Sequence, residues 1–279
     1  MGYDTRVLTA EEIDIAADWA AAEGWNPGHH DATCFQSVDA DGFWGGFLDG
    51  QMIACISVVN YDADFAFLGV YITQPAYRGQ GYGYALWQAA LAHAGTRIVG
   101  LDGVPDEQEN YRKSGFVLAW QNSRFGGVVT PAAPSVDLRP ITAPDAALEA
   151  LDAKVFPTPR PAFWQSWLSA PGHHALAAHS EGQMQGFGVI RPCRDGWKIG
   201  PLVAQTPEIA DALLHGLAHA TGEATPQIFL DLPTANRDAV ALAEGLGLVP
   251  VFETARMYKG PVPQVDLSLI YSVTSYELG

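Results

Sequence analysis

Apolar runs of strand length alternate along the chain with segments of helical pattern. Around Asp49 and Gly50, two apolar or alternating runs span residues 42–61, and this dipeptide is typical of a tight turn between antiparallel strands. The other predicted elements of the first half are a strand at 65–73, a helix at 81–94, a strand at 97–104, a short helix at 107–115 and a strand at 116–125. We therefore expect an α/β fold, a mixed sheet flanked by helices.

The second half of the chain repeats the pattern of the first. The segment RVLTAEE, which begins at Arg6, matches RPITAPD, which begins at Arg139. At nearly the same offset, DGQMIACISVV from Asp49 matches EGQMQGFGVI from Glu181. In each copy a Thr-Ala step followed by an acid predicts a helix start, because threonine oxygens cap helices and acids favour their N-terminal ends. The agreement in offset indicates two diverged copies of one module.

The boundary between the copies is predicted from small residues and prolines. The segment GGVVTPAAPSV at 126–136 has the composition of an irregular connection. We predict a first module at 1–130 and a second, degenerate module at 131–279, each large enough to bury its own core.

The net charge of the chain is −16 at pH 7. A field of this sign repels phosphate backbones and anionic lipid head groups, so we expect neither nucleic acid nor membrane partners. The same field would attract a cationic acceptor such as an amine, although it also suits a surface that is merely solubilising.

The cysteines and the N-terminal residues argue against further classes of protein. Cys34, Cys55 and Cys193 lie far apart and form no C-x-x-C pair, so we expect neither a disulfide framework nor a metal site. The first residues are acidic where a signal peptide would be basic, and no apolar run approaches the roughly 18 residues of a membrane span. The expected location is the cytoplasm.

The segment QPAYRGQGYGYALWQ at 74–88 carries the clearest chemical signal. Glycines at 79, 81 and 83 follow Arg78 and lie between a predicted strand and a predicted helix. Backbone N–H groups at a helix N-terminus bind anions such as pyrophosphate. A P-loop is excluded, because no Gly-Lys-Ser/Thr follows.

A dinucleotide-binding loop is one alternative. Asp102 ends the next predicted strand, at the distance expected of a ribose-binding acid. The third glycine of that motif would fall at Tyr84, however, and the loop should follow the first strand of its domain rather than a hairpin. A nicotinamide enzyme therefore stays an alternative of lower rank.

The loop resembles the acyl-CoA pyrophosphate loop of the GNAT superfamily of N-acetyltransferases. That pattern is Arg/Gln-x-x-Gly-x-Gly/Ala with a proline three positions earlier, and Pro75, Arg78, Gly81 and Gly83 match it position by position. The resemblance extends over the whole chain, to two-domain bacterial members of the superfamily. It implies tandem GNAT-like modules with acetyl-CoA as the cosubstrate.

A second motif of the superfamily, Asn-x-x-Ala-x-x-x-Tyr-x-x-x-Gly-Phe, matches in part. Tyr111, Gly115 and Phe116 stand at its spacing, whereas Val104 and Glu107 replace its asparagine and alanine. The two motifs together are specific, and either one alone would not be.

The resemblance implies where the cofactor binds. A V-shaped opening between two central strands would receive the pantetheine arm as though it were another strand. The first half has only six Lys and Arg residues, and three of them fall in the two motifs, which suits a ligand with several phosphates. The expected cofactor-binding residues are Tyr71, Ile72, Thr73, Arg78, Gly79, Gln80, Gly81, Tyr82, Gly83, Arg112 and Lys113.

Transfer from a thioester to an amine requires a base, an oxyanion donor and an acid. Tyr111 is the predicted acid, because its hydroxyl could protonate the departing sulfur. Asp64 is the first choice for the base, with Asp62, His29 and His30 as alternatives. On the acceptor side, the resemblance points to EGWNPG with Trp25 and Asn26, although a tryptophan beside a turn equally suits a cover for the core. Tyr61 is expected to be a polar contact.

In the second copy, other residues stand at the positions that correspond to the glycine loop. Arg78, Gly79, Gly81 and Gly83 correspond to Ala210, Asp211, Leu213 and His215, and Tyr111 corresponds to Ala243. We predict that the second module keeps the fold and has lost catalysis. The predicted function is an acetyltransferase that acts on a small-molecule or peptide amine; a catalytically silent acyl-CoA-binding protein is the alternative.

Overall fold

The structure, a computed structural model, describes residues 2–279. Its helices are α1 (Ala10–Ala22), α2 (Asp31–Gln36), α3 (Tyr82–Ala94), α4 (Gln108–Lys113), α5 (Ala146–Asp152), α6 (Pro161–Ser169), α7 (Pro207–Ala220) and α8 (Arg237–Gly245). Its strands are β1 (Tyr3–Val7), β2 (Phe43–Leu48), β3 (Gln51–Asn60), β4 (Phe65–Thr73), β5 (Ile98–Gly103), β6 (Val117–Val128), β7 (Asp137–Pro140), β8 (His174–Ser180), β9 (Gln183–Pro192), β10 (Trp197–Ala204), β11 (Gln227–Pro233), β12 (Val249–Lys259) and β13 (Ile270–Ser272).

The predicted helix starts and turn are present. Thr9 and Glu12 form a reciprocal capping box at the start of α1. Asp49 and Gly50 both have positive φ, 52° and 82°, as expected for the tight turn between β2 and β3. The second copy begins α7 in a similar way, with the Thr206 side chain accepting from the Ile209 amide.

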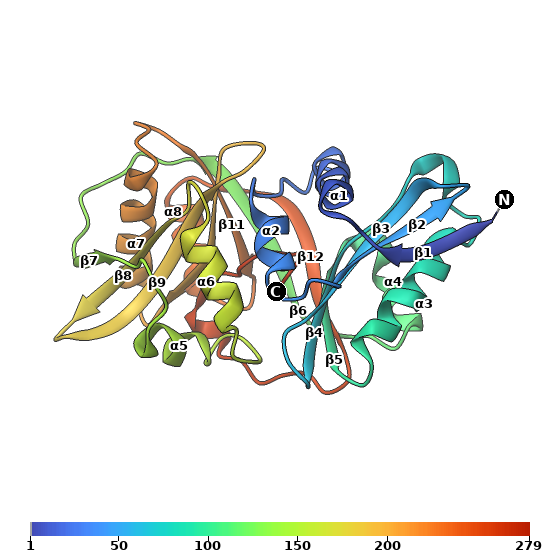
Figure 1. Ribbon diagram of the computed structural model, residues 1–279. Coiled ribbons are helices and arrows are strands. Elements are labelled where there is room, and N and C mark those ends of the chain that lie inside the picture. The colour runs from blue at the N-terminus through green and yellow to red at the C-terminus, as the bar shows by residue number, and fades with distance from the viewer. Residues whose placement is uncertain (1) are drawn as a thin grey trace.

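All the strands belong to one continuous mixed sheet, which confirms the predicted fold class. Its order is β1-β2-β3-β4-β5-β12-β6-β11-β10-β9-β8-β7, with β13 paired to β10 (Figure 1). β4 and β5 are parallel, as are β10 and β11, and the other neighbours are antiparallel. At the centre, β12 from the second half pairs with β5, and β6 from the first half pairs with β11. The two halves thus exchange their last long strands, and a site beside β5 draws on both.

Helices cover both faces of the sheet (Figure 1). Apolar residues of α1, α2, α5 and α6 share one core cluster, which runs across both halves. On the opposite face, Leu86, Trp87 and Ala90 of α3 pack with Tyr111 of α4. The corresponding cluster of the second half is built on α7 and α8. The side chains of β4 therefore face different helix layers on its two sides.

Buried ion pairs hold the two halves in register. Asp102 and Arg256 face each other across β5 and β12, and Arg124 and Asp231 do so across β6 and β11. A third buried pair joins Asp31 of α2 to Arg191 of β9. An unpaired charge in these places would be strongly destabilising, so each pair favours the observed pairing over a shifted one.

The last ten residues, 270–279, form a segment that we call the C-terminal tail. All ten are buried, and the C-terminus lies in the middle of the molecule (Figure 1). The tail begins as β13, which pairs with β10 at Leu202 and Val203, just beyond the point where the β10–β11 ladder ends. It then crosses to the first half, where the Tyr61 hydroxyl donates to the Leu278 carbonyl at 2.9 Å.

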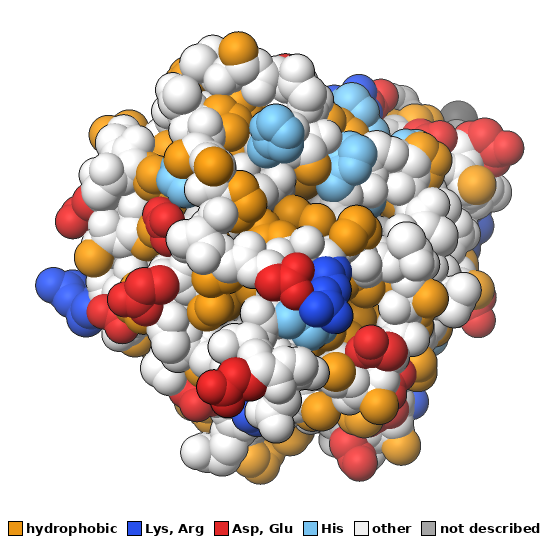
Figure 2. Space-filling model, turned by 90° about the vertical axis from the view of Figure 1, so that its left-hand side faces the viewer, with side chains coloured by type: hydrophobic (Ala, Val, Ile, Leu, Met, Phe, Trp, Pro, Cys, Tyr) orange, Lys and Arg blue, Asp and Glu red, His pale blue; other side chains and the backbone are white. Residues whose placement is uncertain are grey.

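Two features of the surface bear on partners. Figure 2 views the second half end on and shows acidic and basic side chains scattered among other types, with no continuous basic patch among the described residues of this face. Within residues 2–279, no helix has both the length and the apolar character needed to cross a bilayer.

Candidate active site

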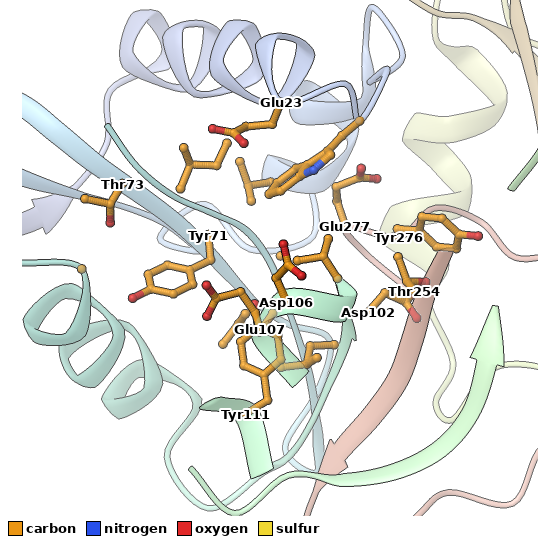
Figure 3. A pocket seen from close by; sticks show the side chains of 18 of the residues that line it. Glu23, Tyr71, Thr73, Asp102, Asp106, Glu107, Tyr111, Thr254, Tyr276 and Glu277 are labelled. Carbon is orange, nitrogen blue, oxygen red and sulfur yellow. The ribbon is translucent and has the colours of Figure 1, made fainter. Parts of the chain in front are cut away.

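A cavity of about 550 Å³ opens where β4 and β5 diverge (Figure 3). The parallel ladder between the two strands ends at Leu68 and Leu101, so residues 69–73 of β4 have no neighbour on their β5 side. β12, α4, the loop before α3 and the C-terminal tail close the rest of the cavity. This is the V-shaped opening that the resemblance implies.

A bulge in β4 causes the divergence. Gly69 pairs with Ser57 and Ile72 pairs with Cys55, so β4 has one residue more than β3 across this step. Val70 lies within the bulge with a φ of 49°, a conformation that β-branched residues rarely adopt and that costs of order 1–3 kcal/mol. Strained backbone conformations are common at functional sites. Here the bulge at Val70 turns the end of β4 away from β5.

The glycine loop lies at the mouth of the cavity. Gly81 is the N-cap of α3 with a φ of 88°, and Gly79 has a φ of 75°, so both positions favour glycine. Gly83 has a different reason, because a Cβ there would lie 2.5 Å from the Thr73 hydroxyl oxygen. All three glycines line the cavity. The backbone from Gly79 to the first turn of α3 therefore presents three positions without side chains to the cavity, as anion binding requires.

Arg78 ties this loop to its surroundings. Its Nε donates to the Thr73 carbonyl at 2.8 Å, and its guanidinium contacts the Glu23 carboxylate at 2.5 Å. Arg78 and Glu23 both line the cavity, as do Tyr71, Ile72 and Thr73. The structure thus brings most of the predicted cofactor residues together.

Four predicted cofactor residues do not line the cavity. The Gln80 amide donates to the Ala76 carbonyl, and the Tyr82 carbonyl accepts from the Tyr3 hydroxyl, so both stabilise the loop from outside. Arg112 and Lys113 are exposed at the end of α4, where Arg112 pairs with a neighbouring glutamate of the same helix. The structure does not bring this basic pair to the opening.

Tyr111 lies against the wall formed by α3. Its ring stacks on Trp87 with centroids 5.5 Å apart, and it lines the cavity while only 8% exposed. Burial raises the pKa of Tyr111 well above its usual value. The phenol therefore keeps its proton at neutral pH.

The structure places the predicted base away from the cavity. Asp64 is exposed in the turn before β4, at the opposite end of that strand from the glycine loop, and it does not line the cavity. Asp62 caps the same turn by accepting from the Asp64 and Phe65 amides. Asp62 thus holds the β3–β4 connection, because short side chains in turns commonly accept from amides two or three residues on, whereas the Asp64 side chain is exposed to solvent. His29 and His30 are also absent from the lining.

Only one of the three predicted acceptor residues lies at the cavity. Trp25 lines the cavity, whereas Asn26 and Tyr61 do not. Asn26 exchanges two hydrogen bonds of 2.9 Å with the backbone of Asp195 and so joins the two halves. Tyr61 is held by the tail carbonyl of Leu278.

The sequence did not identify which residues of the second half would line the cavity. Phe252 and Thr254 of β12 and Tyr276 and Glu277 of the tail all line the cavity. Motif matching could not find them, because they reach the site only through the strand exchange. Phe252 and Thr254 lie in the strand-like pattern of 249–259, and no pattern in the sequence marks Tyr276 and Glu277.

Asp102 is not free to bind a ribose. Arg256 donates to both of its carboxylate oxygens, at 3.0 and 2.7 Å, and the Asn122 amide donates at 2.8 Å. This occupancy removes the feature that supported a dinucleotide site.

The corresponding opening of the second half is filled by protein. β10 and β11 pair only as far as Ile199 and Leu230, and β13 then takes the place beside β10. The Val273 amide donates to the Asp231 carbonyl at 2.7 Å, which ties the same segment to β11. The tail thus occupies the position that the cofactor would need in this module.

Comparisons with known proteins agree with this geometry. Residues 11–116 match the model of the acetyltransferase (GNAT) family, and residues 148–272 match that of an acetyltransferase (GNAT) domain. The chain is 34% identical to the holothin acyltransferase of a Pseudoalteromonas species over 99% of its own length and 95% of the relative.

Solved structures share the fold. One from Pyrococcus horikoshii superposes with a TM-score of 0.86 at 21% identity, covering 100% of this chain and 96% of the other. A tandem GNAT protein from the clavulanic acid biosynthesis pathway superposes with a TM-score of 0.64 at 14% identity, covering 94% and 100%. With two matching domains and a relative that aligns over almost the whole length, this chain belongs to the GNAT family and is a two-domain acyltransferase.

Proposed function

We propose that the protein transfers an acetyl group from acetyl-CoA to the primary amine of a small molecule, in the cavity between β4 and β5. The observation that carries the proposal is the meeting of three features in one cavity: an unpaired strand edge, a glycine loop at a helix N-terminus and a buried tyrosine.

Each feature matches one part of the acyl donor. The pyrophosphate binds the amides of Gly79 and Gly81 at the positive end of α3. The pantetheine arm lies along residues 69–73 and pairs with the backbone groups that β5 leaves unpaired. The thioester then lies near Tyr111, beyond the end of the β4–β5 ladder.

The chemistry proceeds by direct attack. The neutral amine attacks the thioester carbonyl, and unpaired backbone N–H groups of β4 stabilise the negative charge that develops on oxygen. Tyr111, which is protonated before the step, hydrogen-bonds the departing sulfur and donates its proton to the thiolate.

The acceptor is proposed to be cationic in solution. Five carboxylates line the cavity, and two of them, Glu23 and Asp102, are paired with Arg78 and Arg256. The other three, Asp106, Glu107 and Glu277, have no ion-pair partner among the described residues. A surplus of carboxylates attracts an ammonium group and disfavours an acidic acceptor. Holothin, the acceptor in the relative's name, is a candidate acceptor to test directly.

The test measures release of free CoA with a thiol reagent. The donors are acetyl-CoA and longer acyl-CoAs, and the acceptors are holothin and a panel of amines, amino acids and peptides. We expect the fastest release with acetyl-CoA and a small amine. Calorimetric binding of acetyl-CoA without release for any acceptor would instead identify a silent binding protein.

A further inference from the structure

The C-terminal tail is fixed where it enters the cavity wall. The Leu278 amide donates to the Ser275 hydroxyl at 3.0 Å, and the Gly279 amide donates to the Ser275 carbonyl at 3.1 Å. The same segment accepts from the Tyr61 hydroxyl. Local hydrogen bonds and a contact to the first half thus hold the residues on both sides of Glu277.

Glu277 differs from two other acids that line the cavity, the exposed Glu23 and the buried carboxylate of Asp102. Glu23 contacts Arg78, and Asp102 is held by Arg256, but no hydrogen bond joins the Glu277 carboxylate to any described residue from 2 to 279. Its Oε2 is fully buried, and the residue as a whole is only 5% exposed. A buried carboxylate without a partner is costly, so its presence beside a ligand cavity calls for a functional reason.

The charges around Glu277 come from five other elements, because Arg191 of β9, which is bound by Asp31, also interacts with it. Burial is the largest influence and raises its pKa, while Lys198 of β10 and Arg124 of β6 lower it and Asp31 of α2 and Asp231 of β11 raise it. The cations are already shared, because Arg124 is bound by Asp231 and Lys198 lies 3.8 Å from the same carboxylate. Glu277 therefore binds a proton more readily than an ordinary glutamate.

Glu277 and Tyr111 lie on opposite sides of the cavity (Figure 3). Tyr111 belongs to the cluster under α3 and α4, whereas the backbone of Glu277 contacts Gly69 and its neighbour Leu278 belongs to the cluster under α1 and α2. A thioester lying between them would present its sulfur to the tyrosine and its other face to the glutamate.

We propose that Glu277 is the catalytic base, which removes a proton from the acceptor ammonium before attack. The proposal rests on the proposed function, because it needs an amine acceptor in this cavity. Glu277 is the described acid that combines burial, a free carboxylate and a place on the cavity wall.

The proton balance is complete with the groups present. One ammonium N–H bond breaks, its proton passes to the Glu277 carboxylate, and the freed electron pair forms the bond to the thioester carbon. The C–S bond then breaks, and the thiolate takes the Tyr111 proton. The amine's second proton returns to the tyrosine through solvent, and Glu277 releases its own, so one proton is produced for each amide formed.

The test compares Glu277→Gln with the wild type. The amide keeps the size of the side chain and cannot accept the proton. We expect acetyl-CoA affinity to stay within about twofold and kcat/KM for the amine at pH 7 to fall by about 10² to 10⁴, the usual effect of losing a general base. The loss should shrink as the pH rises, because the free amine becomes abundant without help.

Two further variants separate catalysis from folding. Glu277→Asp should recover part of the rate, and formate should rescue Glu277→Ala by supplying a carboxylate. Glu253→Gln is the matched control, because this exposed residue of β12 does not line the cavity and its loss should leave the rate unchanged.

The outcomes distinguish the proposed role of Glu277 from the proposed acyl transfer on which it rests. A wild type that transfers to no amine in the panel overturns the proposed function. A wild type that transfers, with Glu277→Gln equally fast across the pH range, overturns the role of Glu277 alone. A variant that is slow at every pH by the same factor, with no rescue by formate, also overturns it and assigns Glu277 to packing.

Discussion

A Cβ atom on Gly69 would lie 2.4 Å from the carbonyl oxygen of Glu277. The tail therefore contacts β4 at a residue that has no side chain, directly before the strained Val70. This contact places a carboxylate from the end of the chain beside the opening in the first module, and it makes the position of the tail sensitive to one methyl group.

We predict that Gly69→Ala displaces the tail without removing the cofactor site. Overpacking of this kind costs about 1–3 kcal/mol. Acyl transfer should fall by at least tenfold, and acetyl-CoA affinity measured by calorimetry should fall by less than the rate, because the pantetheine arm is proposed to pair with the backbone of residues 69–73. Gly245→Ala is the control, because nothing lies within 4 Å of the added methyl there. Equal activity in the two variants would show that the tail position is not needed for turnover.

Gly81→Glu should abolish acetyl-CoA binding, because it places a carboxylate at the N-terminus of α3 where the pyrophosphate is proposed to lie. The control is Gly50→Glu, which has a similar φ of 82° and equally open surroundings in the β2–β3 turn. Calorimetric titration should give one equivalent per chain for the wild type and for the control, and none for Gly81→Glu. A second equivalent that survives in the variant would show cofactor binding in the C-terminal module, contrary to the filling of that opening by β13.

Tyr111→Phe should lower kcat by about 10- to 100-fold with little change in acetyl-CoA affinity, because the hydroxyl acts on the leaving thiolate. Steady-state kinetics and calorimetry together make the measurement. Tyr271→Phe removes a hydroxyl from a buried tyrosine that does not line the cavity and should turn over normally. If Tyr111→Phe is as fast as this control at every pH, Tyr111 serves packing against Trp87 only.

Asp64→Asn should leave kcat and KM within about twofold of the wild type, since exposed substitutions away from a site have small effects. Asp64 is exposed in the β3–β4 turn and outside the cavity. The same kinetic assay that follows Glu277→Gln makes the comparison. A loss of turnover that recovers at high pH would return the role of base to Asp64.

The stability of the protein should also report on Glu277. Its pKa is above 4.5 in the folded state, so the folded protein keeps this proton at pH values where the unfolded chain has released it. The stability that this contributes is fully present below the unfolded pKa and is lost as the pH rises through the folded pKa. Glu277→Gln removes this loss, so its free energy of unfolding should exceed that of the wild type at pH 7, and the difference should vanish near pH 4.

Denaturant titrations at several pH values make this measurement, with Glu253→Gln as the exposed control. A wild type and a Glu277→Gln variant with parallel stability profiles would contradict a raised pKa at this carboxyl. We expect the Glu277→Gln variant to be more stable than the wild type and much slower. This combination is typical of a buried group that is retained for catalysis although it destabilises the fold.

Local patterns were sufficient to predict the glycine loop and the elements around it. The loop needs backbone N–H groups at a helix start, and that requirement involves only neighbouring residues, so Arg78, Gly81 and the following helix could be recognised directly. The hairpin at Asp49–Gly50 and the capped start of α1 are local in the same sense. The repeated pattern of both halves likewise predicted the mixed sheet with its flanking helices.

The rest of the site depends on contacts between distant parts of the chain. Tyr61 and Leu278 are 217 positions apart, and the hydrogen bond between them exists only because β12 crosses into the first half and the tail follows it. Whether a carboxylate acts as a turn cap or lies free in a cavity depends on which partners the tertiary structure provides. Asp64 and Glu277 have the same chemistry in the sequence; the exchange of strands buries one without a partner and leaves the other in solvent, because strand pairing and not residue type decides what surrounds each.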